Sequence, residues 1–420
     1  MPRSLPPYPT LEGLRKEAKQ LLASYRSGDV ATCEMLRKLA RLARADDKRI
    51  LAADLGLQEV QQALALDYGF KSWADLAAFV TAGDAESASG KGAHVLRGLR
   101  WVRRATTHMG CLEGCLNHLG LDMSPGWLFG ATGHAFFISV SDDFCPAGPH
   151  SWRYFDVVPR LGANLGIDFD VMMALPWEDD DGFPAKHEAI WHAVRDAIDA
   201  GRPCYGWHYE FAVIAGYDDT GYLLSGPIKA PRVHPLGHQL FHSWRDFGAT
   251  AGPGSVEIAS IGPGQAADDM TTVRDALAFA TQDAQNGEGS GIGGYDAWIR
   301  GLSPSRDETN VGDRYHVAYH AAIWSECRAF AHAFLDEARA RLGGRQAPIL
   351  ARAAECYLAV GDALTEVATL FPLLDGQEGQ MRANVEDADR RARAVEALGE
   401  ARTAEQTGLA ALRHALTAIQ

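Results

Sequence analysis

The stretch Cys111-Leu-Glu-Gly-Cys-Leu-Asn-His-Leu-Gly120 places a cysteine directly after a glycine, at the expected start of an apolar helix. Backbone N–H groups at a helix start stabilise anions, so a cysteine there is biased toward the thiolate. The thiolate is the nucleophilic form of cysteine. A second stretch, Gly130-Ala-Thr-Gly-His-Ala-Phe136, predicts a glycine-rich turn that enters an apolar strand over 135–140. The leading hypothesis is therefore that Cys111 is a nucleophile.

The surrounding segment, from about 94 to 265, has the pattern of an α+β domain in which antiparallel strands follow helices. Its expected elements are a helix over 111–119, a Pro-Gly turn at 125–126, a helix over 189–200, a strand over 211–216, a hairpin turn at 217–221 and a return strand over 222–225. Tyr217-Asp-Asp-Thr-Gly221 carries the hairpin, because Asp and Gly favour tight turns between strands.

Helical patterns flank this domain on both sides. Residues 11–80 predict four helices, and the Gly/Ser/Ala-rich stretch 81–92 predicts a linker. From about 268 onward, long amphipathic helices are expected over 272–282, 319–341, 348–374 and 390–419, with a glycine-rich connecting loop at 287–294. The expected domains are a helical module over 1–82, the α+β domain over 93–267 and a helical region over 268–420.

Composition narrows the classes of partner. The 420 residues carry a net charge of −14, which argues against nucleic acid and anionic lipid as partners. Seven cysteines, an odd number in a long chain, argue against a disulfide framework. No apolar run reaches membrane-spanning length, and the first residues lack the apolar core of a signal peptide. We expect a cytoplasmic protein with free thiols.

The middle segment resembles the papain-like domain of the butirosin biosynthesis protein H family, and distantly the double-glycine cysteine peptidases that process bacteriocins. The matching features are Cys111 with Cys115 and Gly120, then Ser124–Gly130 with Gly133, then Gly201-Arg-Pro203, then Gly216-Tyr-Asp-Asp-Thr-Gly-Tyr222. The resemblance covers roughly 94–265 and, more weakly, Gly294-Tyr-Asp-Ala-Trp-Ile299. It implies a bacterial, papain-like, cysteine-dependent enzyme of specialised metabolism.

The N-terminal residues resemble a second family, the helical module that often precedes ankyrin repeats in bacteria. The resemblance rests on Leu11-Glu-Gly-Leu-Arg-Lys-Glu-Ala-Lys, Gly28-Asp29 and Asp67-Tyr-Gly-Phe-Lys-Ser-Trp-Ala-Asp-Leu76. It implies no chemistry.

The base that would serve Cys111 has three candidates. In the resembled enzymes a histidine begins the strand that leads into Gly-Tyr-Asp, and that position falls on Glu210 here. The nearest histidine is His208, two residues earlier, which is displaced by about 6–7 Å along a strand. His134, in the glycine-rich turn, is the third candidate. A carboxylate beside the thiol would raise the thiol pKa and weaken catalysis.

Gly133, Trp207, Tyr209 and Asp218 are the residues expected to contact a substrate. A metal site is the weaker alternative, since His108, Cys111, Cys115 and His118 have zinc-like spacing. On one helix the outer pair would lie about 15 Å apart, too far for one zinc ion. We expect neither a metal nor a cofactor.

Two functions follow as hypotheses. The first is a cysteine acyltransferase or amide hydrolase that acts through a Cys111 thioester on a small-molecule or carrier-bound acyl substrate. The alternative is a catalytically decayed papain-like domain that binds a small, cationic ligand, with Glu210 and Asp218 in an acidic pocket. An acyl carrier protein and a second copy of the chain are the candidate macromolecular partners. A fully buried Cys111 would favour binding.

Overall fold

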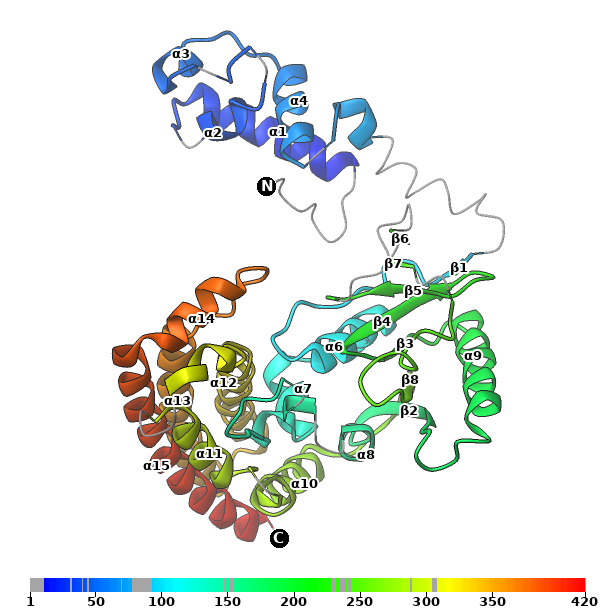
Figure 1. The fold of residues 1–420 in the computed structure, drawn as a ribbon, viewed down its shortest axis with the longest axis vertical. Helices are drawn as coiled ribbons and strands as arrows, with labels where there is room; N and C mark the ends of the chain where they lie inside the picture. Colours follow the sequence, from blue (N-terminus) through cyan, green and yellow to red (C-terminus); the bar gives the residue numbers. More distant parts are fainter. Residues whose placement is uncertain are drawn as a thin grey trace. The chain divides into compact units, whose positions relative to one another are not determined.

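The computed structural model describes residues 11–30, 32–39, 41–43, 45–68, 70–77, 93–146, 148–150, 154–227, 232–233, 239–240, 243–287, 289–303 and 308–419. The chain divides into two compact units, residues 1–94 with 230–240 and residues 95–229 with 241–420. The expected linker at 81–92 lies outside the described residues. Figure 1 shows the elements of each unit.

The first unit is helical, as the periodicity predicted. Its helices are α1 (Leu11–Arg26), α2 (Thr32–Leu36), α3 (Asp47–Leu51) and α4 (Leu57–Asp67), and residues 73–77 are also helical. Two small apolar clusters hold them together, one around Leu36 and Ile50 and one around Leu14 and Leu64. The fourth predicted helix is described only as far as residue 77. The short strands β6 (Arg232–Val233) and β7 (Gln239–Leu240) pair with each other.

The second unit is built around an antiparallel sheet, which confirms the α+β class. The strands are β2 (Leu165–Ala174), β3 (Cys204–His208), β4 (Glu210–Tyr217), β5 (Tyr222–Ser225) and β8 (Val256–Ala266), in the order β2-β8-β3-β4-β5. The two-residue strand β1 (His94–Val95) precedes them. The predicted hairpin is confirmed: Tyr217 pairs with Tyr222, and the Asp218 N–H donates to the Gly221 carbonyl.

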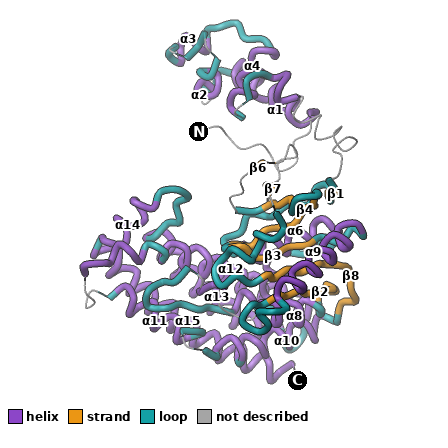
Figure 2. Tube along the Cα trace, turned by 45° about the vertical axis from the view of Figure 1, so that its right-hand side comes forward, coloured by secondary structure: helices purple, strands orange, loops and turns teal. Residues whose placement is uncertain are grey.

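Helices cover both faces of this sheet, and Figure 2 shows the strands as one band between them. α6 (Thr107–Leu119) packs on one face against β3, β4 and β8, and α9 (Phe183–Asp199) packs on the other. The shorter elements α7 (Pro125–Ala131), η2 (His134–Phe136), η3 (Gly148–His150) and α8 (Tyr154–Gly162) follow α6 in the chain. The predicted helix over 189–200 is confirmed as the second part of α9.

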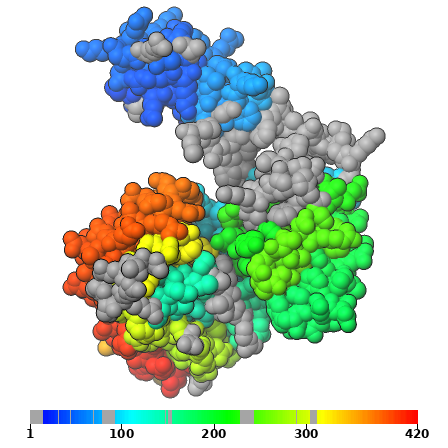
Figure 3. All heavy atoms as spheres, in the orientation of Figure 1, coloured from blue at the N-terminus to red at the C-terminus, as the bar shows by residue number. Residues whose placement is uncertain are grey.

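The C-terminal helices join the same core. They are α10 (Asp269–Thr281), η4 (Asp283–Gln285), α11 (Ile292–Leu302), η5 (Glu308–Arg314), α12 (Val317–Leu342), α13 (Ala347–Leu370), α14 (Glu378–Glu386) and α15 (Ala388–Ile419). The four predicted long helices are confirmed, and one hydrophobic cluster runs from Leu99 to Leu416 across the expected boundary at 267. In the space-filling view, α14 and α15 form the orange and red part of the surface (Figure 3).

Two local predictions are wrong. Residues 135–140 do not form a strand: a 3-10 turn covers His134–Phe136, and only an isolated bridge joins Ser139 to Ser290. The glycine-rich loop lies against this segment, where the Val140 N–H donates to the Gly289 carbonyl. The second error is the start of the cysteine helix, which lies four residues earlier than expected. None of the helices in the described ranges is long and apolar enough to cross a membrane.

Candidate functional site

The N-terminus of α6 lies at Thr107, so Cys111 is the fifth residue of the helix. Only the first turn of a helix has backbone N–H groups that are free to face an anion. Cys111 therefore lies outside the region where the helix end stabilises a thiolate. The prediction that the thiol sits at the helix start is wrong, because Gly110 continues the helix instead of preceding it.

The first turn of α6 instead receives two carboxylates of the protein itself. Glu326, on α12, accepts a hydrogen bond from the backbone N–H of Thr106 at 3.2 Å. Glu210, the first residue of β4, accepts one from the Thr107 hydroxyl at 2.7 Å. Since the side chain of Thr106 does not cap the helix, these acids supply the negative charge that a helix N-terminus favours.

Glu210 is held from two directions. The Tyr319 hydroxyl donates to its second carboxylate oxygen at 2.9 Å, and the Thr107 oxygen in turn accepts the backbone N–H of Phe211 at 3.3 Å. Burial, followed by the charge of Glu210, raises the pKa of Tyr319 well above its usual value, so this hydroxyl stays a donor. The carboxylate is thereby fixed in direction while remaining only partly buried.

Glu326 lies near Arg104 and Glu113. Burial raises the pKa of Glu326, whereas the backbone donors of Thr106 and Ala105 and the Arg104 guanidinium lower it. Arg104 pairs with Glu113 at 2.7 Å, and both side chains are mostly buried. Three carboxylates and one guanidinium thus surround the first turns of α6, and the local charge is negative.

Cys111 belongs to the hydrophobic core. Its exposed fraction is 0%, and burial, followed by the nearby Cys115 and Glu210, raises the pKa of its thiol well above the usual value. Within the described ranges, the thiol forms no hydrogen bond with an imidazole. Tyr205, a buried residue that also adjoins Cys111, pairs through its hydroxyl with His108 Nε2 at 3.1 Å. A buried, protonated thiol is a poor nucleophile.

His134 is also buried, with an exposed fraction of 2%. It opens the turn after Gly133, whose φ of 79° is one that glycine adopts without strain. Its ring lies 5.9 Å from the ring of His108 and 5.9 Å from that of Phe129. Phe279 and Leu161 pack against Gly133, so the space beside this glycine is filled by the core. The structure places both predicted residues in the interior.

His208 ends β3 and Glu210 begins β4, and the two residues pair across these strands with one residue between them. Their side chains make different contacts. His208 Nδ1 accepts the backbone N–H of Gly248 at 3.0 Å, and its ring stacks on Phe247 at 5.7 Å. Burial lowers the pKa of His208, consistent with an unprotonated Nδ1 that accepts. The structure therefore commits His208 to the loop after residue 243, and Glu210 to α6 and α12.

Tyr209 forms the reversal alone, with a φ of 61° that is unusual for a residue other than glycine. Its side chain is 63% exposed, and its hydroxyl donates to the Thr250 carbonyl at 3.2 Å. The ring of Trp207 lies 6.4 Å away and packs on Gly252. Both aromatic side chains therefore contact the loop that contains Thr250 and Gly252.

Asp218 does not join this group. Its carboxylate closes the β4–β5 turn by accepting the N–H groups of Thr220 at 2.7 Å and Gly221 at 3.0 Å. It follows the last residue of β4, whereas Glu210 is the first, and eight residues of extended strand span about 27 Å. The two acids therefore cannot form one pocket, because the strand separates them.

The four residues with zinc-like spacing do lie on one helix, α6. In the described part of the chain, no group of three or more His, Cys, Asp or Glu side chains is arranged to hold a metal ion. His320, on α12, is buried, and its Nε2 lies 2.9 Å from the Cys145 carbonyl oxygen.

Three site residues were missed from the sequence: Thr107, Tyr319 and Glu326. Thr107 lies four residues before Cys111, and a Thr at the start of an apolar helix is a recognisable helix-start signal. Tyr319 and Glu326 lie on one face of α12, seven residues or two turns apart. Nothing in the sequence indicates that this face meets α6, because more than 200 residues separate them.

Comparison with known proteins adds no relative. A scan against models of protein families finds no match to the chain, and a search of curated proteins finds none. The resemblance to the butirosin biosynthesis protein H family therefore remains a prediction that rests on the residues quoted above.

Proposed function

We propose that this protein is a binding protein for a small organic cation, built on a papain-like α+β domain that has lost its catalytic cysteine chemistry. The observation that carries the proposal is the convergence of Glu210 and Glu326, from β4 and α12, on the first turn of α6. The helix-on-sheet arrangement supports the papain-like assignment.

The chemistry of the site favours an amine. Glu210 is oriented by two hydroxyl donors, and an ionised carboxylate has further lone pairs with which to accept hydrogen bonds from an ammonium group. Tyr209 precedes Glu210 in the chain and its side chain is 63% exposed, and aromatic faces attract organic cations. Because Glu326 supplies a second acid at the same helix end, a diamine suits the site better than a monoamine.

Acyl transfer through Cys111 is the competing proposal, with a small-molecule amide or a carrier-bound thioester as substrate. It requires a thiolate and an imidazole in contact with it. Burial acts against the thiolate, and Nδ1 of His208 accepts the backbone N–H of Gly248. We therefore favour binding.

Isothermal titration with putrescine tests the proposal, with butylamine as the monoamine comparison. We expect putrescine to bind more tightly than butylamine, and the Glu210→Gln variant to bind putrescine at least about tenfold more weakly, since loss of a desolvated charge pair costs 2 kcal/mol or more. Asp218→Asn is the matched control and should retain wild-type affinity, because it lies at the far end of β4.

The pH dependence follows from Glu326. Protonation removes its charge, so affinity for the diamine should fall as pH falls. Because burial raises the pKa of Glu326, this loss should begin at a higher pH than for a surface glutamate, whose pKa is about 4.3.

Failure of putrescine to bind the wild-type protein, or equal affinity of the Glu210→Gln variant, would overturn the proposal.

A further inference from the structure

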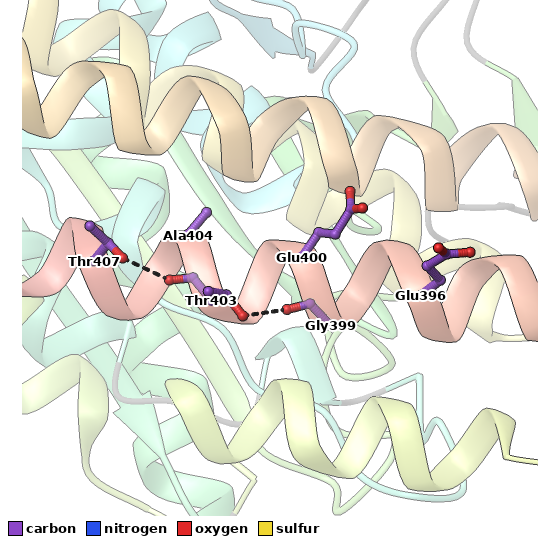
Figure 4. A pocket seen from close by; sticks show the side chains of 6 residues that line it. All are labelled: Glu396, Gly399, Glu400, Thr403, Ala404 and Thr407. Atoms are coloured by element: carbon purple, nitrogen blue, oxygen red, sulfur yellow. Dashed lines mark hydrogen bonds between the residues drawn. The ribbon is translucent and has the colours of Figure 1, made fainter.

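Two shallow grooves lie end to end along the exposed side of α15. The first, of about 520 Å³, is lined by Glu396, Gly399, Glu400, Thr403, Ala404 and Thr407, which follow one another along the helix (Figure 4). The second, of about 450 Å³, is lined by Pro348, Ile349, Arg352, Thr407, Ala410, Ala411 and His414. Thr407 belongs to both.

The floor of these grooves is suited to contact with another helix. Small side chains let two helix backbones approach closely. The hydroxyl of Thr403 donates to the Gly399 carbonyl at 2.9 Å, and that of Thr407 donates to the Thr403 carbonyl at 3.1 Å (Figure 4). Since both hydroxyls are satisfied within α15, covering them leaves no unpaired donor.

The two ends of the grooves differ in charge. Glu396 and Glu400 lie at one end, and Arg352 and His414 lie at the other. A helix laid along the grooves in the opposite direction, with the same charges, would place each acidic end on a basic end. That is the condition for electrostatic complementarity between two copies of one surface.

We propose that a second copy of this chain occupies these grooves, with α15 packed antiparallel on its counterpart about a two-fold axis through Thr407. This axis relates Glu400 to His414, Thr403 to Ala411 and Ala404 to Ala410, and all six residues line the grooves. The first groove of one copy therefore meets the second groove of the other. The 32 residues of α15 span about 48 Å, which gives a long contact line.

The mass in solution, measured by light scattering during size-exclusion chromatography, tests the proposal. We expect twice the chain mass of 45.5 kDa for the wild-type protein at about 100 µM, where an interface of micromolar affinity is filled. Thr407→Arg should give the single-chain mass. Gln406→Arg is the matched control: Gln406 is exposed on the same helix but lines neither groove, so this variant should stay dimeric.

A charge exchange covers the case in which Thr407→Arg disturbs folding. Glu400→Arg and His414→Glu, at the two positions that the axis places opposite each other, should each give the single-chain mass, and the double variant should restore twice that mass. A wild-type protein of single-chain mass at this concentration overturns the proposal. So does a dimer that survives both Thr407→Arg and the single charge changes, because its interface must then lie elsewhere.

Discussion

The Glu405→Gln variant is expected to lower the free energy of unfolding by about 3–5 kcal/mol, because it leaves a buried guanidinium without its counter-charge. Arg328 on α12 and Glu405 on α15 pair at 2.7 Å, with side-chain exposures of 0% and 1%. The hydroxyls of Tyr295 and Tyr357 donate to the same carboxylate at 2.9 and 3.0 Å. Urea denaturation followed by tryptophan fluorescence measures the loss.

The matched control is Glu366→Gln, which removes the partner of Arg393 on the surface. That pair is similar in length, at 2.8 Å, but its side chains are 62% and 47% exposed. Its loss should cost less than about 1 kcal/mol, since water screens exposed pairs. Equal effects of the two substitutions on the free energy of unfolding would contradict a stabilising role of the buried Arg328–Glu405 pair.

Gly114→Ala is expected to destabilise the protein by about 1–3 kcal/mol, although alanine is the better helix former. A Cβ at Gly114 would lie 2.0 Å from the Arg100 carbonyl oxygen, and one at Gly110 would lie 2.2 Å from that of Val102. The Val102 N–H also donates to the Gly110 carbonyl at 3.0 Å. The segment before α6 therefore lies directly on the helix, so a Cβ at Gly114 would force this segment to shift.

Gly293→Ala provides the control for this prediction. Gly293 is also helical, in the first turn of α11, and nothing lies within 4 Å of a Cβ built there. Its replacement should change the free energy of unfolding by no more than about 1 kcal/mol. A Gly114→Ala variant as stable as the wild-type protein would mean that the 100–102 segment is not held against α6.

Periodicity predicted the helices well, because each amphipathic helix carries its own signal. The four long C-terminal helices and the β4–β5 hairpin appear where local patterns place them. The edge strand β2 was missed although Ile167, Phe169 and Val171 alternate with Asp168 and Asp170, a period-2 signal that could have been used. In β8, Gly262-Pro-Gly264 interrupts the strand pattern, which hides it.

The errors at the site arise from contacts between distant residues. Residues 135–140 have the composition of a strand, but Arg328 Nη1 donates to the carbonyls of Ala135 and Phe137, which holds a turn there. Gly110 was interpreted as a helix break, but it lies inside α6, and its lack of a side chain makes room for the Val102 carbonyl. The resulting shift of four residues removes Cys111 from the helix start, and no local pattern signals it.

The alkylation rate of Cys111 in the folded protein tests the central claim most directly. Native protein is treated with iodoacetamide at pH 8.5, near the usual thiol pKa, and modification at each cysteine is followed by mass spectrometry. Cys145 is exposed and serves as the internal reference. We predict that Cys145 is modified in the native state, whereas Cys111 is modified only after unfolding in urea. If native Cys111 is modified faster than Cys145, and still reacts well below pH 8.5, the thiol is not buried. That result would favour the hypothesis that Cys111 is a nucleophile.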